Sequence, residues 1–164
     1  MRQLSIAVLA LLGMSNLAFA QEAVFETKSL TPETALVAAK TALESCRKQG
    51  YQVAVAVVDR AGLTQVLLRD RFAGAHTIDV ATNKAWTAAS FRTSTLSLAA
   101  DSQAGKPLSG LRGVPRFVGL GGGIVIEGGG TYFGGIGVSG APGGDLDEAC
   151  AKAGIKAISD AIEF

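Results

Sequence analysis

Apolar and polar residues alternate with two different periods along this chain, and the combination predicts an α+β fold. A period of three to four residues, which is typical of a helix that buries one face, recurs in several stretches. The predicted helices cover residues 31–50, 77–91, a short stretch at 94–101, and about 145 to the C-terminus. Shorter runs rich in β-branched residues predict strands at 51–59, 63–69, 123–127 and 131–138.

Local signals define the ends of these elements. Thr31 and Pro32 suit the cap and the first position of the first helix, and Gly50 ends it. The turn at 60–62 joins two predicted strands as a hairpin. The glycine cluster at 119–123 is followed by a strand, whereas a dinucleotide-binding loop leads into a helix. The cluster therefore does not indicate a nucleotide site.

The first twenty residues have the features of a secretory signal peptide. A basic residue at position 2 precedes a short apolar core, and the segment ends in Ala18-Phe19-Ala20. We therefore expect residues 1–20 to be a signal peptide and residues 21–164 to form a single domain in the periplasm or outside the cell. An N-terminal anchor helix is the alternative. No later run is long and apolar enough to cross a membrane.

Charge and composition narrow the possible partners. Without residues 1–20 the chain has fourteen basic and fourteen acidic residues, because Arg2 is the one charged residue in that segment. A balanced charge does not indicate nucleic-acid binding, for which a basic stripe is expected. Near-zero charge and a high apolar content fit a homo-oligomer, although many monomers share them.

Two cysteines, Cys46 and Cys150, lie on the apolar sides of the first and last predicted helices. In an oxidising compartment such a pair indicates a disulfide first. Two helices packed on one face of a sheet could bring the two thiols together. Two buried free thiols are the alternative.

Several segments in a fixed order resemble the GlcG/HbpS family of haem-binding proteins, whose domain also forms the C-terminal part of PduO-type adenosyltransferases. The resemblance covers nearly all of the chain after position 30. The segments are VVDRAG (57–62), AGA (73–75), ATNKAWTA (81–88), GGIVI (122–126) and GGIGVSG (134–140), the last continuing into APGGDLD.

The resemblance implies a profilin-like domain with a central antiparallel sheet of about five strands. The first and last helices would cover one face of the sheet, and the middle helices would cover the other. It also implies a homo-oligomer, haem as the cofactor, and a role in haem capture, storage or redox sensing. The alternative is a protein that binds a small molecule, or an enzyme acting on a small organic substrate, without haem.

His76 is the candidate iron ligand, because it is the single histidine and both methionines lie within residues 1–20. A histidine exposed at a helix start is the simpler interpretation. Tyr132 and Tyr51 are other side chains able to bind ferric iron, and Trp86 is adjacent to the same helix face as His76. Two further candidates, Arg112 and Arg116, could hold haem propionates, or could be ordinary surface residues.

Ser139 lies in a Gly-Val-Ser-Gly context that superficially resembles the nucleophile elbow of a hydrolase. A nucleophile elbow requires a strand, a sharp turn, a helix and a histidine base, and the distance from Ser139 to His76 does not follow from the sequence. We therefore predict no catalytic residue and favour a binding protein over an enzyme.

Overall fold

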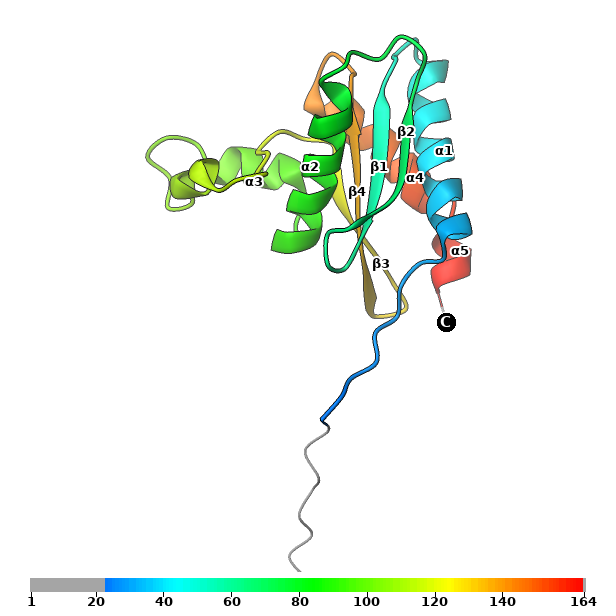
Figure 1. Cartoon of the computed structure of the whole chain (residues 1–164). Helices are drawn as coiled ribbons and strands as arrows, with labels where there is room; N and C mark the ends of the chain where they lie inside the picture. The colour runs from blue at the N-terminus through cyan, green and yellow to red at the C-terminus, as the bar shows by residue number, and fades with distance from the viewer. Residues whose placement is uncertain (1–22, 164) are drawn as a thin grey trace, which may run out of the picture.

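The computed structural model describes residues 23–163, which fold as four strands and several helices (Figure 1). Along the chain the elements are α1 (Pro32–Lys48), β1 (Ala54–Asp59), β2 (Thr64–Arg69), α2 (Thr77–Phe91), α3 (Thr95–Asp101), a 3-10 helix (Ser109–Gly113), β3 (Gly123–Gly128), β4 (Thr131–Ser139), α4 (Gly144–Lys156) and α5 (Ser159–Ile162). The predicted signal peptide lies outside the described residues. No helix in the described part of the chain is long and apolar enough to cross a membrane.

The strands form one antiparallel sheet in the order β2-β1-β4-β3. The α+β class is as predicted, but the expectation of about five strands is wrong, because the sheet built from the described residues has four. All four are runs that the alternation of apolar residues predicts. The segment before α1 does not add a fifth strand, since residues 23–29 extend away from the sheet (Figure 1).

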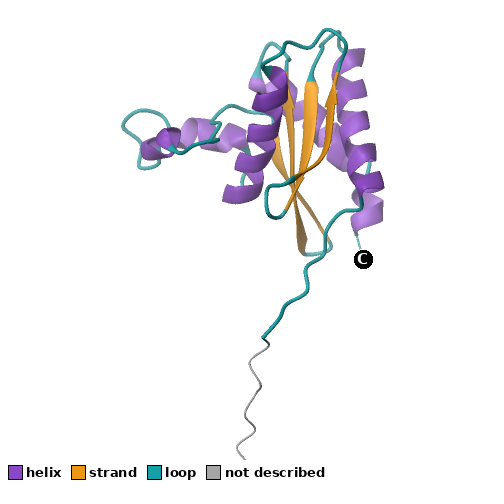
Figure 2. Ribbon diagram, viewed as in Figure 1, coloured by secondary structure: helices purple, strands orange, loops and turns teal. Residues whose placement is uncertain are grey.

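Helices cover both faces of the sheet, as the family resemblance implied (Figure 2). One face packs against α1 and α4, and the opposite face packs against α2. Beyond α2, α3 and the 3-10 helix project sideways from the body of the domain (Figure 1).

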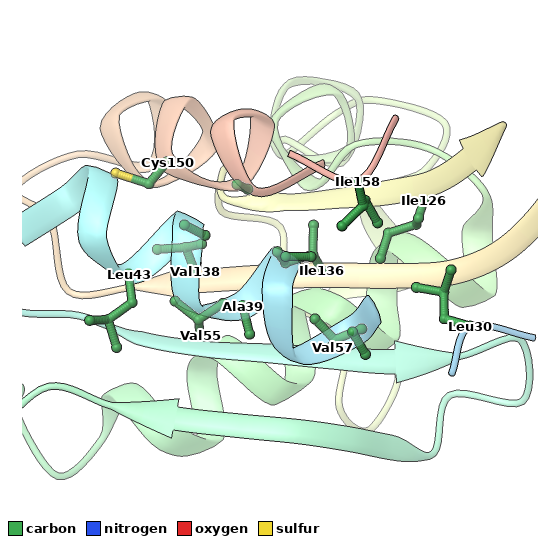
Figure 3. Packing of buried hydrophobic residues seen from close by; sticks show 14 of the residues in the cluster. Leu30, Ala39, Leu43, Val55, Val57, Ile126, Ile136, Val138, Cys150 and Ile158 are labelled. Carbon is green, nitrogen blue, oxygen red and sulfur yellow. The ribbon is translucent and has the colours of Figure 1, made fainter. Parts of the chain in front are cut away.

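The α1/α4 face contains the larger core. Large aliphatic side chains of the sheet, including Val55, Val57 and Ile136, meet the alanine-rich inner face of α1 (Figure 3). At one end of this core Cys46 and Cys150 form a disulfide with a Cα–Cα distance of 5.5 Å, within the ordinary range for such bonds. The predicted pairing of the two cysteines is therefore confirmed.

Under α2 the packing is much closer, because β4 presents glycines to the helix. A Cβ added at Gly137 would lie 2.1 Å from the carbonyl oxygen of Ala81, and one added at Gly135 would lie 2.6 Å from that of Ala85. Only residues without a side chain allow this approach. The close contact fixes α2 on the sheet, and with it the residues at both ends of the helix.

Candidate functional site

A cavity of about 530 Å³ opens where the start of α2 meets the loop between β4 and α4. This volume falls within the range of small-molecule sites, about 300–1,000 Å³. Its wall includes the polar residues His76, Lys84, Ser139 and Asp147. The backbone of residues 140–144 closes one side.

His76 lies at the first turn of α2, in the cap position, and its side chain makes no capping hydrogen bond. The residue is exposed, and its ring lies against Gly74, where an added Cβ would be 2.8 Å from the imidazole Cε1. Glycine at this position therefore allows the ring to fold back onto the loop. The exposed apolar side chains of Phe72 and Leu120 also line the cavity. The imidazole is thus available to a ligand, beside apolar surface.

Lys84 and Asp147 form a buried ion pair in the cavity wall. The Lys84 ammonium donates to the Asp147 carboxylate at 2.8 Å and to the carbonyl oxygen of Val138 at 2.9 Å. The other carboxylate oxygen of Asp147 accepts a hydrogen bond from the Ala141 amide at 2.9 Å. These contacts connect α2, the end of β4 and the first turn of α4.

The ionisation of this pair is affected by two opposing causes. Burial lowers the pKa of Lys84, and the neighbouring Asp147 carboxylate partly offsets that change. Burial likewise raises the pKa of Asp147, and the Lys84 ammonium partly offsets it. Both directions reflect the cost of keeping charges away from water. The two charges are retained because each is the other's partner.

Of the other predicted site residues, Tyr51 also lines the cavity, whereas Arg112, Arg116, Trp86 and Tyr132 do not. Arg116 and Trp86 lie together, with the guanidinium carbon 4.9 Å from the centre of the indole ring. The Nε of Arg116 also donates to the side chain of Asn83 at 3.3 Å. Arg112 instead donates to the carbonyl oxygen of Ser102 at 2.6 Å, on the projecting segment. Arg112 therefore has a structural partner away from the cavity.

Tyr132 lies near the opposite end of α2 from His76. Its hydroxyl donates to the carbonyl oxygen of Ala89, in the last turn of that helix. The guanidinium carbons of Arg92 and Arg60 lie 5.1 and 5.4 Å from the centre of its ring. Burial raises the pKa of Tyr132, and the two arginines partly offset the change. A helix of fifteen residues is about 22 Å long, so Tyr132 and His76 belong to different surroundings.

Sequence reasoning missed Lys84 and Asp147. One signal was present: Lys84 lies between Ala81 and Ala88 at helical spacing, on the apolar stripe of α2. A charged residue on a buried stripe needs a partner, so a paired lysine could have been expected there. Nothing in the sequence named Asp147 as that partner. The fold also places Ser139 in the wall of the same cavity as His76.

Comparison with known proteins shows which family has this fold. A sequence model of the HbpS-like family, described as haem-degrading protein HbpS-like, matches residues 30–156. A crystal structure of HbpS has 40% sequence identity and a TM-score of 0.77, and the match covers 84% of this chain and 95% of that one. A double mutant of HbpS from Streptomyces reticuli has 36% identity and a TM-score of 0.78, covering 97% and 99% of the two chains.

A third structure, the complex of PduOC with haem, has 30% identity and a TM-score of 0.75, covering 80% of this chain and 96% of that one. A search of curated protein sequences finds no match. The family match extends over both the α1/α4 core and the cavity at the start of α2. This chain therefore belongs to the HbpS-like family.

Proposed function

We propose that this protein is an exported haem-binding protein in which His76 ligates the iron, with a role in haem capture, storage or redox sensing. The observation that carries the proposal is the position of His76. Its imidazole has no capping hydrogen bond and lines a 530 Å³ cavity beside exposed apolar side chains. Family membership and the haem complex of PduOC support haem as the ligand.

The residues at the cavity fit a haem group. Neutral imidazole is a common axial ligand of haem iron, and Phe72 and Leu120 provide apolar contact for a porphyrin edge. Bound haem would supply the redox chemistry of its iron. The protein would hold the ring through His76 and limit the access of water to it. Arg116, held by Trp86 and Asn83, is the better placed of the two predicted propionate partners, because Arg112 is bound elsewhere.

Titration of the haem-free protein with haemin tests this proposal. Wild-type protein should give a Soret band that saturates at one haem per chain or per symmetric site. His76→Ala should shift the Soret maximum and lower the affinity at least tenfold, whereas Arg116→Ala should lower affinity without changing the band position. A His76→Ala variant with unchanged spectrum and affinity would refute His76 as the ligand.

The same experiment addresses the alternative of a small-molecule protein without haem. A protein that binds no haemin, yet is stabilised by a small organic compound, would support the alternative. The family description also includes haem degradation. Following the Soret band over hours with ascorbate as reductant would separate a stable complex from one in which the haem is destroyed.

The proposed assembly is a homo-oligomer, as expected from the sequence. Exposed apolar residues on several elements, such as Leu36 and Val37 of α1 and Leu120 beside the cavity, are available for contact between subunits. Light scattering of the mature protein at micromolar concentration should give a mass of at least a dimer. A monomer mass would contradict this part of the proposal.

A further inference from the structure

Ser139 is a nearly buried residue of the cavity wall whose hydroxyl bonds to no described residue. It ends β4, and side chains alternate along a strand, so it faces the same side as Gly135 and Gly137 beneath α2. The residue is 5% exposed and lines the cavity. Within residues 23–163 its hydroxyl makes no hydrogen bond. Because Ser139 lines the cavity, a polar group bound there would give this hydroxyl a partner.

Lys84 provides a second donor at the same end of the cavity. An ammonium has three N–H donors, and two of those on Lys84 are used by Asp147 and by the carbonyl oxygen of Val138. No third partner is found among the described residues. Val138 directly precedes Ser139, so the ammonium lies beside the backbone that carries the unpaired hydroxyl. Lys84 is fully buried, so its positive charge acts on the cavity from within the wall.

The first turn of α4 adds backbone donors. Its cap residue, Gly143, has no side chain to accept hydrogen bonds from the first amides of the helix. Gly143 and Gly144 both line the cavity. The start of a thirteen-residue helix also carries a partial positive charge, which favours an anion. The Ser139 hydroxyl, the Lys84 charge and the first turn of α4 thus all lie in the wall at the inner end of the cavity.

The charges present determine which anion fits. Asp147 already neutralises Lys84 and lies within the same wall, and Asp145 is exposed nearby. A dianionic phosphate would be repelled by these carboxylates. A carboxylate group carries one negative charge and needs few donors, so it suits a site whose single ammonium is already partly compensated.

We infer that the inner end of the cavity, formed by Ser139, Lys84 and the first turn of α4, binds a carboxylate group. This inference deepens the proposed function and partly rests on it, because the carboxylate could be a haem propionate. His76 and Lys84 are eight residues apart on α2, about 12 Å of helix rise. A flat ligand held at His76 would extend along the helix towards this end. A free small organic acid has the same chemistry and is the second possible source.

Haemin and haemin dimethyl ester, which lacks free carboxylates, test the first source. If a propionate occupies the site, wild-type protein should bind haemin about tenfold more tightly than the ester. Ser139→Ala should lower haemin affinity about fivefold, leave ester affinity unchanged and leave the Soret maximum in place. Ser90→Ala, an exposed serine of the same helix that carries His76, is the matched control and should change neither affinity.

Acetate and succinate, added to haem-free protein, test the second source. If a free acid occupies the site, these salts should raise the melting temperature more than chloride at equal ionic strength, and Ser139→Ala should abolish the difference. This arm does not require haem, so it remains informative if the proposed function fails. The inference is overturned if Ser139→Ala leaves the preference for haemin over its ester unchanged and neither acid stabilises wild-type protein more than Ser139→Ala.

Discussion

The two faces of the sheet are built on different principles. The α1/α4 face holds large aliphatic side chains and a disulfide, whereas the α2 face holds glycine and alanine contacts. Lys84 of α2 reaches Asp147 of α4 in a buried ion pair beside the cavity. Aliphatic burial contributes free energy without directing chemistry. Close backbone packing instead leaves α2 little freedom to shift on the sheet. It therefore fixes the positions of His76 and Lys84. We conclude that the first face mainly stabilises the domain and that the second positions His76 and Lys84 in the site.

Removing the disulfide tests the first half of this comparison and has the largest expected effect. The bond links residues 104 positions apart, so Cys46→Ala combined with Cys150→Ala should lower the free energy of unfolding by about 4 kcal/mol. Urea denaturation under oxidising conditions measures the change. Haemin binding by the folded variant should remain, because neither cysteine lines the cavity. Loss of the haem spectrum while the variant is still folded would show that the two faces are not independent.

The buried ion pair offers a test of the second face. Lys84→Met alone leaves the Asp147 carboxylate buried and unpaired, and should lower the free energy of unfolding by about 3 kcal/mol. Asp147→Leu alone should act similarly. The double variant Lys84→Met/Asp147→Leu should recover most of the loss, since neither charge is left buried.

A double variant as unstable as either single one would contradict this reading of the pair. Recovery of stability together with a loss of preference for haemin over its dimethyl ester would be the sharper result. It would show that the two charges are retained for the ligand rather than for the fold.

A smaller loss of stability is expected from changing Asp70, which links α1 to the loop before α2. Its carboxylate accepts two hydrogen bonds from Arg47 at the end of α1, at 2.8 and 2.9 Å, and it begins the loop that leads to His76. The Arg47 guanidinium lowers the pKa of Asp70. Because the pKa of Asp70 is lower in the folded state, its carboxylate stabilises the fold at pH values above the ordinary aspartate pKa of about 3.9. This contribution to the free energy of unfolding is lost as the pH falls through the folded-state pKa.

Asp70→Asn should therefore reduce stability at pH 7, and wild type and variant should converge as pH falls below about 4. Denaturation series at several pH values measure the difference. Glu44→Gln, which changes an exposed ion pair within α1, is the control and should have almost no effect at either pH. If wild type and Asp70→Asn differ in stability as much in acid as at pH 7, the ionised carboxylate is not the cause of the difference.

The sequence predicted the elements well because their signals are local. The strands are the same four runs that alternation indicates, and the cysteines could be paired because both lie on apolar helix faces. The fifth strand was implied by resemblance alone, and no residue pattern supported it. Local signals in the sequence were thus more reliable than the strand count implied by the family resemblance.

The site was less predictable because it depends on contacts between distant segments. Lys84 and Asp147 are 63 positions apart and meet only because β4 returns beneath α2 before α4 begins. Arg112 and Arg116 are close in sequence, yet one binds the projecting segment and the other stacks on Trp86. Tertiary packing decides such partners, and no spacing in the sequence encodes them.

Ligation of haem iron by His76 can be measured directly, because of the composition of the chain. His76 is the single histidine of the sequence, so protein labelled with ¹⁵N-histidine reports one imidazole by nuclear magnetic resonance. On addition of one equivalent of haemin, the account predicts that the imidazole nitrogen resonances shift far outside their normal range or broaden beyond detection. Zinc protoporphyrin, which is diamagnetic, should cause a modest shift. Imidazole resonances that stay unchanged while the Soret band forms would contradict the account.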